Sequence, residues 1–312
     1  MKKIIFTGGG SGGHVIPAKT IINEIMSRKT DISLFYIGGK TSIEREIISE
    51  LGICYHAIST GKLRRYFSIE NVLDFFRFLI GIIQSLLILF SYRKNSVVFS
   101  TGGFVALPVV IASRILGIKS VIHEQTAVAG LANKISSKFC DKVLVSFEKS
   151  IENFPKSKTV LTGYPVSKNC FTDPGFPIDV KPQVSLESKG LKKVLLITGG
   201  GNGSKLINEV TKKVLQDLKK DFRVFHQVGR KFEREFRRFD DESYTSFGFT
   251  NSLIDLIKIS DIVVSRAGAG MVMELISIGK KSIFVPLKIA QKNEQFHNAN
   301  EAKSILGSEI IL

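Results

Sequence analysis

The stretch Lys3-Ile4-Ile5-Phe6-Thr7-Gly8-Gly9-Gly10-Ser11-Gly12-Gly13-His14 decides the fold, because a short apolar run passes directly into a glycine-rich turn. The same arrangement returns in the second half as Ile197-Thr198-Gly199-Gly200-Gly201-Asn202-Gly203-Ser204. A strand, a glycine turn and a following helix are the opening unit of a Rossmann-like domain. Its recurrence predicts two such domains in one chain.

Short β-branched runs alternate with longer amphipathic stretches on both sides of the second turn. We expect strands at residues 3–7, 33–37, 97–100, 120–123, 142–146, 159–162, 193–198, 223–227, 246–248, 261–265, 282–286 and 310–312. Unbroken apolar strands that alternate with helices indicate parallel sheets covered on both faces. Between residues 166 and 191 the pattern lapses into prolines and polar residues, among them Pro174, Pro177 and Pro182. We therefore predict an α/β protein with doubly wound domains at 1–166 and 191–312, a connector at 167–190 and a ligand cleft between the domains.

Composition bounds the class of protein. The 312 residues are 44% hydrophobic and 23% charged, enough to build two cores and too apolar for a disordered chain. The three cysteines, Cys54, Cys140 and Cys170, are widely spaced, which argues against a disulfide framework or a zinc site and favours a reducing cytosol. The first residues run into the glycine turn without a long apolar stretch, so we read them as a strand and not as a signal peptide. The net charge of +16 would suit an anionic membrane, a phosphorylated substrate, nucleic acid or simply a lysine-rich proteome.

Glycine turns at strand ends bind anions, because their backbone N–H groups and the dipole of the following helix both favour negative charge. Neither turn contains the Lys-Ser/Thr pair of a P-loop. The second strand, residues 33–37, runs into Gly38-Gly39-Lys40 and offers no acid for a ribose, which disfavours NAD. A third turn, Ser100-Thr101-Gly102-Gly103-Phe104, follows the strand at 97–100. Three such turns in a basic chain indicate more than one phosphate-bearing ligand.

One of the five histidines is placed for catalysis. A single histidine is more often a structural residue, and His123 and His226 near strand ends fit that interpretation equally well. His14 directly follows the first glycine turn, where a neutral imidazole could take a proton from a hydroxyl near neutral pH. His14 is therefore the candidate general base.

The ordered set of motifs resembles the MurG family, the UDP-N-acetylglucosamine:undecaprenyl-pyrophosphoryl-muramoyl-pentapeptide N-acetylglucosaminyltransferases. The matching segments cover nearly the whole chain: Gly9–His14 with Pro17, Gly61-Lys62-Leu63-Arg64-Arg65, Gly102-Gly103-Phe104-Val105 with Pro108, His123-Glu124-Gln125, Ala129-Gly130-Leu131-Ala132-Asn133-Lys134, Gly199–Ser204, Ser265-Arg266-Ala267-Gly268-Ala269 with Glu274, Val285-Pro286-Leu287, and Glu294-Gln295 with Asn298-Ala299. No single segment is decisive, but the order is specific.

The resemblance implies a GT-B fold and an inverting transfer of N-acetylglucosamine from UDP-GlcNAc to the C4 hydroxyl of the muramoyl unit of lipid I, giving lipid II. It implies no cofactor and no metal, and the chain lacks the DxD motif of metal-dependent glycosyltransferases. Glu274 is expected to accept the ribose hydroxyls, Thr250 to lie where uracil is read, and Glu294 with Gln295 to hold the sugar. The remaining expected donor residues are Gly10, Ser11, Gly12, Thr126, Ser167, Gly201, Asn202, Ala269, Gly270 and Met271. The expected acceptor and cleft residues are Gly13, Gly102, Gly103, Phe104, Glu124 and Asn133.

Three positions depart from the family pattern. Thr126 stands where Asn is common after His-Glu-Gln, and Ser167 replaces the arginine of Asn-Pro-Val-Arg. Gly201 replaces a serine that usually meets phosphate, with Ser204 as a candidate substitute. Loss of an arginine–phosphate pair would weaken donor binding or change donor preference. The chain also ends at Leu312, where family members continue with further helices.

Residues 73–92 are the most apolar stretch, interrupted by Asp74, Arg77, Gln84 and Ser85. Their uninterrupted part is shorter than the roughly 20 residues that a spanning helix needs. The segment is either a core helix or, as we prefer, a patch that dips into the membrane, with Lys62, Arg64 and Arg65 before it and Arg93 and Lys94 after it. The expected location is peripheral, on the cytoplasmic face of the bacterial cell membrane.

Other functions remain open at this point. A related glycosyltransferase with a diacylglycerol acceptor would keep the UDP site and the apolar patch. A non-catalytic UDP-sugar-binding membrane protein would explain the three departures. UDP-N-acetylglucosamine 2-epimerases share the fold but lack the apolar segment and the pattern around His14. Nucleic acid is the least expected partner, because the basic residues are not interleaved with aromatic ones.

Overall fold

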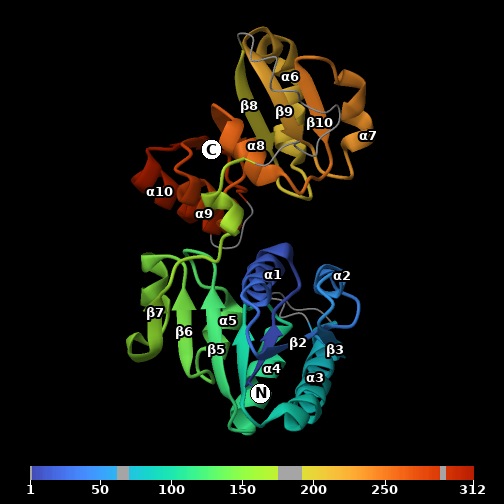
Figure 1. Cartoon of the computed structure of the whole chain (residues 1–312), viewed down its shortest axis with the longest axis vertical. Helices are drawn as coiled ribbons and strands as arrows, with labels where there is room; N and C mark the ends of the chain where they lie inside the picture. The colour runs from blue at the N-terminus through green and yellow to red at the C-terminus, as the bar shows by residue number, and fades with distance from the viewer. Residues whose placement is uncertain (1, 62–69, 175–191, 289–292) are drawn as a thin grey trace. The chain divides into compact units, whose positions relative to one another are not determined.

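The computed structural model describes residues 2–61, 70–174, 192–288 and 293–312, which form two compact units, Met1–Pro165 and Val166–Leu312. Each unit is built around one parallel sheet flanked by helices (Figure 1). The prediction of two doubly wound α/β domains is confirmed. Lys62, Arg64, Arg65, Pro177 and Pro182 lie outside the described residues.

The first unit has a seven-stranded sheet in the order β3-β2-β1-β4-β5-β6-β7, with every described pair parallel. Its strands are β1 (Lys2–Thr7), β2 (Ile32–Gly39), β3 (Cys54–Ile58), β4 (Ser96–Ser100), β5 (Lys119–Glu124), β6 (Lys142–Val145) and β7 (Thr159–Leu161). Its helices are α1 (Gly12–Ser27), α2 (Ile43–Ser49), α3 (Glu70–Tyr92), α4 (Ala106–Ile115) and α5 (Leu131–Ser136), with short 3-10 turns η1 (Glu148–Asn153) and η2 (Lys156–Lys158).

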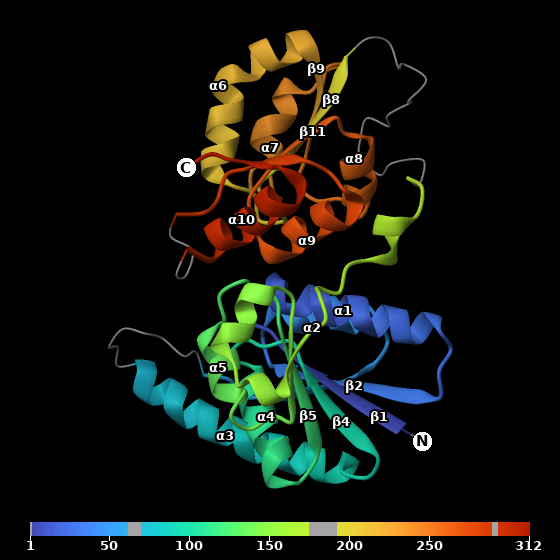
Figure 2. The ribbon, with the colours of Figure 1, turned by 90° about the vertical axis from the view of Figure 1, so that its left-hand side faces the viewer.

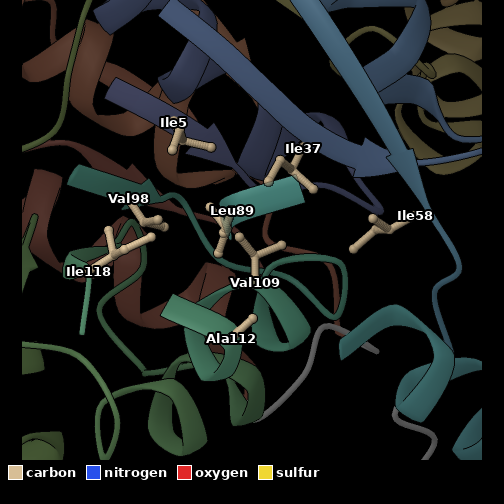
Figure 3. Close-up of a cluster of buried hydrophobic side chains, with 8 residues drawn as sticks. All are labelled: Ile5, Ile37, Ile58, Leu89, Val98, Val109, Ala112 and Ile118. Carbon is tan, nitrogen blue, oxygen red and sulfur yellow. The ribbon is translucent and has the colours of Figure 1, made fainter. Parts of the chain in front are cut away.

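Successive residues of these strands point to opposite faces, so both faces of the sheet carry a core. On one face the strands pack against α3 and α4 in a cluster of Ile5, Ile37, Ile58, Leu89, Val98, Val109, Ala112 and Ile118 (Figure 3). On the other face the strand residues Phe6 and Tyr36 cluster with residues of α1 and α2, which are Val15, Ala18, Ile22 and Ile48. Figure 2 shows α3 and α4 side by side along the sheet. Burial on both faces explains why the strands are apolar without interruption.

The second unit has a six-stranded parallel sheet in the order β10-β9-β8-β11-β12-β13. Its strands are β8 (Lys193–Thr198), β9 (Phe222–Gln227), β10 (Tyr244–Phe247), β11 (Ile262–Ser265), β12 (Ser282–Phe284) and β13 (Glu309–Ile310). Its helices are α6 (Lys205–Asp221), α7 (Glu233–Phe236), α8 (Leu253–Ile259), α9 (Ala269–Ile278) and α10 (Glu294–Leu306), with the 3-10 turns η3 (Lys168–Phe171) and η5 (Arg237–Phe239). The turn η3 falls in the predicted connector and packs against α8 and α9.

In both sheets the strand order reverses beside the strand that precedes the main glycine turn, between β1 and β4 and between β8 and β11. Ligands of open α/β sheets bind at the carboxyl ends of strands at such switch points. The expected strands are present to within about two residues, but β3 was missed. It lies at the sheet edge and is mostly partly exposed, so its residues, Cys-Tyr-His-Ala-Ile, lack an apolar run.

The apolar segment at 73–92 is part of one unbroken 23-residue helix, α3. Its stretch Val72–Tyr92 is long and apolar enough to cross a membrane by length and composition, although a single such helix is weak evidence for a span. Polar residues do interrupt its apolar run, as the sequence indicated, yet the helix continues through Asp74, Arg77, Gln84 and Ser85. Those residues do not break a helix, and Asp74 and Ser85 lie on its buried side.

Candidate active site

Three strand ends of the first unit meet at one edge of the sheet, since β1, β4 and β5 are neighbours. The Thr101 amide donates to the Thr7 carbonyl (2.9 Å), and the Gly9 amide donates to the Gly102 carbonyl (3.2 Å). These bonds join the turn after β1 to the turn after β4. Together with the contact between His14 and Gln125, they place Gly10–His14 beside Gly102–Phe104 and the loop that contains Glu124 and Thr126. All of these except Gln125 were predicted as site residues.

The glycines of these turns fall into two groups: those that the packing requires and those that it does not. Gly103 has φ +82°, and a Cβ there would lie 2.1 Å from the Gly9 carbonyl oxygen, so the fold itself demands glycine. Gly10, with φ +84°, lies against the Phe104 ring. At Gly12 an added Cβ would meet no atom within 4 Å, and at Gly13 only the Ser11 hydroxyl at 3.8 Å. Packing does not require glycine at Gly12 and Gly13, which leaves the first amides of α1 accessible to an anion.

The turn after β1 rests on a buried carboxylate that the sequence did not reveal. Glu44, in the first turn of α2, is fully buried and accepts hydrogen bonds from the amides of Gly10 (3.2 Å) and Gly39 (3.1 Å). The second strand itself ends without an acid, as the sequence indicated, but α2 brings Glu44 back to the end of that strand. The Gly10 amide donates to this carboxylate and is therefore used within the protein. The backbone amides that could meet an anion are those of the residues after Gly10.

His14 lies in the first turn of α1, and its ring is held through one nitrogen. Its Nδ1 lies 3.0 Å from the Thr101 carbonyl oxygen and 3.1 Å from Gln125 Oε1. Both partners are acceptors, so Nδ1 carries the proton and Nε2 has a free lone pair. A bare Nε2 is what a general base requires.

The neighbouring acid, Glu124, is fully used in shaping the loop after β5. Its Oε1 accepts from the amide (3.1 Å) and hydroxyl (2.8 Å) of Thr126, and its Oε2 accepts from the Gly130 amide (3.1 Å) and Asn133 Nδ2 (3.0 Å). Glu124 and Asn133 are both 2% exposed, so these bonds hold without competing water. Thr126, one of the departures from the family pattern, thus takes part in the loop with its own hydroxyl.

In the second unit the turn after β8 is held by side chains on both sides. The Thr198 hydroxyl donates to Gln227 Oε1 (2.6 Å) and accepts from the Gly200 amide (3.0 Å). Ser204 caps α6 by accepting from the Ile207 amide, and it accepts from Arg266 Nε (3.0 Å) and Nη2 (2.7 Å). Ser204 therefore has a structural role in this turn as an acceptor, and these three bonds do not use its own O–H proton. Gly201 and Asn202 are exposed in the turn, and an added Cβ at Gly201 would meet no atom within 4 Å.

Arg266 also donates through Nη1 to the carbonyls of Val285 (2.8 Å) and Pro286 (3.1 Å). It thereby ties together the segments that follow β8, β11 and β12. The motif around Arg266 was recognised in the sequence, but this clamp depends on contacts between segments far apart in the chain. The Arg266 guanidinium therefore connects three strand-end segments of this unit.

Glu274 lies on α9, whose first turn contains Ala269, Gly270 and Met271. Burial of its carboxyl raises its pKa to about 7. A buried carboxyl that titrates near neutrality is a common mark of a functional site. His226, in contrast, is fully buried, and its Nδ1 is hydrogen-bonded to the Tyr244 hydroxyl at 2.9 Å. Burial lowers its pKa to about 3, which is typical of a structural histidine.

The other expected donor residues are distributed around the same unit. Thr250 is buried and its hydroxyl accepts from the Ser252 amide (3.0 Å), while Phe249 is exposed under the Arg230 guanidinium. Gln295, beside Glu294 at the start of α10, accepts from the Leu287 amide (3.0 Å). Ser167 accepts from the Asn169 amide (3.2 Å) and so begins η3. The structure thus assigns a local role to Ser167.

Among the described residues, no group of three or more His, Cys, Asp or Glu side chains could hold a metal ion. The expected metal-independent reaction stays a prediction.

The chain matches two family models in tandem. Residues 4–145 match the glycosyltransferase family 28 N-terminal domain, and residues 194–312 match the glycosyltransferase family 28 C-terminal domain. Together these models cover most of both units.

Curated relatives resemble nearly the whole chain. A protein of Clostridium perfringens (strain 13 / Type A) is 40% identical over 301 residues, 96% of this chain and 82% of its own length. A protein of Clostridium botulinum (strain Langeland) is 39% identical over 96% of this chain and 83% of its own length. Both are named UDP-N-acetylglucosamine–N-acetylmuramyl-(pentapeptide) pyrophosphoryl-undecaprenol N-acetylglucosamine transferase.

Solved structures show the same fold. MurG from Acinetobacter baumannii matches with a TM-score of 0.73 at 24% identity, covering 100% of this chain and 85% of that one. A UDP-glucosyltransferase from Polygonum tinctorium matches with a TM-score of 0.66 at 14% identity, covering 99% and 85%. Both comparisons bear on the GT-B fold alone.

Proposed function

This chain belongs to glycosyltransferase family 28, and from that premise we propose that it transfers N-acetylglucosamine from UDP-GlcNAc to the muramoyl unit of lipid I. The product is lipid II, the disaccharide precursor of peptidoglycan. The two clostridial relatives carry this activity in their names. The observation in this chain that carries the proposal is the bare Nε2 of His14 beside the open glycines Gly12 and Gly13.

The chemistry is a single displacement. His14 Nε2 removes the proton of the acceptor C4 hydroxyl while that oxygen attacks C1 of the donor sugar. The new C4–O–C1 bond forms as the bond from C1 to the diphosphate breaks, which inverts C1 and releases UDP. The proton stays on the imidazole, and its Nδ1–H remains hydrogen-bonded to the Thr101 carbonyl and to Gln125.

The second unit supplies groups suited to UDP. The N-termini of α6 and α9 present backbone amides to a diphosphate, and the accessible Gly201 lets a phosphate approach closely. Glu274 would accept the ribose hydroxyls in its ionised form. Helix dipoles and amides would stabilise the leaving UDP, so the proposal requires no metal.

We place the enzyme on a membrane surface through α3. The outer side of this helix exposes the large side chains of Val72, Leu73, Phe75, Phe76, Leu79, Ile80, Ile83, Leu87 and Phe90, each between 39% and 69% accessible. Its buried side instead carries Asp74, Gly81 and Ser85 with Leu89. Gly81 allows close packing, since a Cβ there would lie 2.3 Å from the Ser59 carbonyl oxygen.

A helix with its largest apolar residues outward is expected at an apolar phase. Only 22% of the apolar stretch is buried, which is far too little for a core helix. Because α3 packs lengthwise on the unit, we propose that it lies in the interface and does not cross the bilayer. Arg93 and Lys94 follow it and would favour anionic headgroups by about 1 kcal/mol each.

Transfer of radiolabelled N-acetylglucosamine from UDP to a short-chain lipid I analogue, with EDTA present, tests the proposal. Wild type should form product and His14→Ala should lose at least about a hundredfold in kcat, the contribution of a general base. His56→Ala, at the edge strand β3, is the matched control and should keep its activity. Product on diacylglycerol instead of lipid I would change the acceptor class, and UDP binding without transfer to either would contradict the enzyme assignment.

A further inference from the structure

A chain of hydrogen bonds fixes which nitrogen of His14 carries a proton. The Thr101 carbonyl oxygen can only accept, so the 3.0 Å contact with His14 Nδ1 favours a proton on Nδ1. Gln125 Oε1 is a second acceptor for the same proton at 3.1 Å. Nε2 is then the deprotonated nitrogen.

The orientation of the Gln125 carboxamide is fixed by His123. Its Nε2 lies 3.0 Å from the His123 carbonyl oxygen, which places the NH₂ group there and turns Oε1 toward His14. The same NH₂ group reaches His123 Nδ1 at 3.2 Å, while His123 Nε2 donates to the Gly163 carbonyl at 3.0 Å. Backbone carbonyls of Thr101, His123 and Gly163 thus assign every proton along the chain from Gly163 to His14.

Burial makes this arrangement rigid. Gln125 and His123 are each 2% exposed, so water cannot replace a bond that is lost. Burial also lowers the pKa of His123, which keeps its ring neutral and its Nδ1 able to accept. Glu124, the adjacent acid, cannot serve His14 because its two oxygens are used by Thr126, Gly130 and Asn133.

We propose that Gln125, clamped by His123, is a positioning residue that holds His14 in the Nδ1–H tautomer and supports the imidazolium formed during transfer. This inference rests on the proposed function for its catalytic consequence. The carboxamide takes the place that a carboxylate would occupy in a His–acid pair, so the base is oriented by a neutral dipole. Its loss should lower kcat and leave the KM for UDP-GlcNAc nearly unchanged, because its side-chain partners, His14 and His123, are not expected donor residues.

The first readout is independent of turnover. In protein labelled with ¹⁵N-histidine, the protonated and bare ring nitrogens of His14 have separate shifts, assigned by comparison with His14→Gln. Wild type above the imidazole titration should show a protonated Nδ1 and a bare Nε2. In Gln125→Met, which keeps the shape but neither hydrogen-bonding group, the two shifts should move toward each other and kcat should fall about fivefold to tenfold, the equivalent of one hydrogen bond.

Gln125→Glu provides the second variant, because it retains an acceptor for His14 Nδ1–H. It should keep the Nδ1–H tautomer and more of the rate than Gln125→Met does, and it carries the test if the methionine variant does not fold. Ser150→Ala is the matched control, since it removes a buried hydrogen bond to the Thr126 carbonyl (2.7 Å) in the same loop without touching His14. It should leave the His14 shifts unchanged.

Unchanged His14 shifts and rate in a folded Gln125→Met would overturn the proposal, as would a protonated Nε2 in wild type. Absence of transfer in wild type, with the Nδ1–H tautomer present and sensitive to Gln125, would instead count against the proposed function alone.

Discussion

The Glu44 carboxylate accepts a hydrogen bond from the Gly10 amide at 3.2 Å, across 34 residues of sequence. Its other oxygen accepts from the Gly39 amide, so one buried side chain connects the turns that follow β1 and β2. The same carboxylate raises the pKa of Tyr36 and of Tyr55, in each case as a smaller contribution than burial. The turn after β1 leads directly to Gly12, Gly13 and His14, so Glu44 supports the backbone from which the proposed base extends.

Glu44→Gln replaces one accepting oxygen by an NH₂ group that must face a backbone amide. Two donors then oppose each other in a fully buried position, and we expect a loss of about 1 to 3 kcal/mol in the free energy of unfolding. Urea denaturation measures this, and kcat should fall as the turn loosens. Glu46→Gln, exposed on the same helix, should change stability by no more than about 0.5 kcal/mol. Equal effects of the two substitutions would exclude the role assigned to Glu44.

Local patterns predicted the strands and the glycine turns well, because buried parallel strands are apolar throughout and their ends carry the turns. The exception, β3, pairs along one side only, and its His56 contacts the Tyr92 hydroxyl and the Cys54 thiol. An edge strand with such contacts carries little periodic signal. Its detection required knowledge of the neighbouring strand β2.

Candidate site residues beside a local motif could be proposed from the sequence, whereas residues that act through tertiary contacts could not. His14 could be chosen because it follows a glycine turn in sequence. Glu44 and Arg266 act on segments 34 and 62 residues away, and no spacing rule connects those positions. The structural role of Ser204 was missed for the same reason, since its partner Arg266 lies 62 residues away in the chain.

Glu274→Gln should make the protein more stable at alkaline pH while it weakens UDP binding. The folded pKa of about 7 lies above the ordinary value of 4.5, so ionisation of the buried carboxyl opposes folding. The cost is absent below pH 4.5, grows between pH 4.5 and 7, and is complete above. We therefore expect Glu274→Gln to raise the free energy of unfolding by about 1 to 3 kcal/mol at pH 8 and by almost nothing at pH 4.

For the same reason the affinity of wild type for UDP should rise with pH through about 7, as the carboxylate that accepts the ribose hydroxyls becomes ionised. Calorimetric titration at several pH values measures this, with exposed Glu309→Gln as the control. A pH-independent affinity, or a variant that binds UDP as well as wild type does, would remove Glu274 from the donor site.

The outward face of α3 should determine membrane binding. Ile83 and Leu87 are 58% and 69% exposed, so replacing both by serine removes apolar contact with lipid and little from the core. We expect binding to phosphatidylglycerol-containing vesicles to weaken at least about tenfold, since each side chain contributes up to about 1.5–3 kcal/mol when buried. Vesicle co-sedimentation measures the binding.

The control for this surface lies on α6, where Leu206 and Val210 are 53% and 52% exposed. Their replacement by serine removes comparable apolar area from the other unit. If both pairs reduce vesicle binding equally, general hydrophobicity and not α3 accounts for the association.

Gly201→Ser should strengthen donor binding. Gly201 lies outside the left-handed region, and an added Cβ would meet no atom within 4 Å, so serine fits the turn without strain. A hydroxyl at this exposed position of the turn before α6 can donate to a phosphate oxygen, and we expect UDP to bind about threefold to tenfold more tightly. Gly200→Ser is the matched control, because its φ of +81° strains any side chain. That variant should lose about 1 kcal/mol of stability without a gain in affinity. Calorimetry with UDP and denaturation of both variants distinguish the cases: a folded Gly201→Ser that binds UDP no better than wild type would mean that this turn does not face the diphosphate.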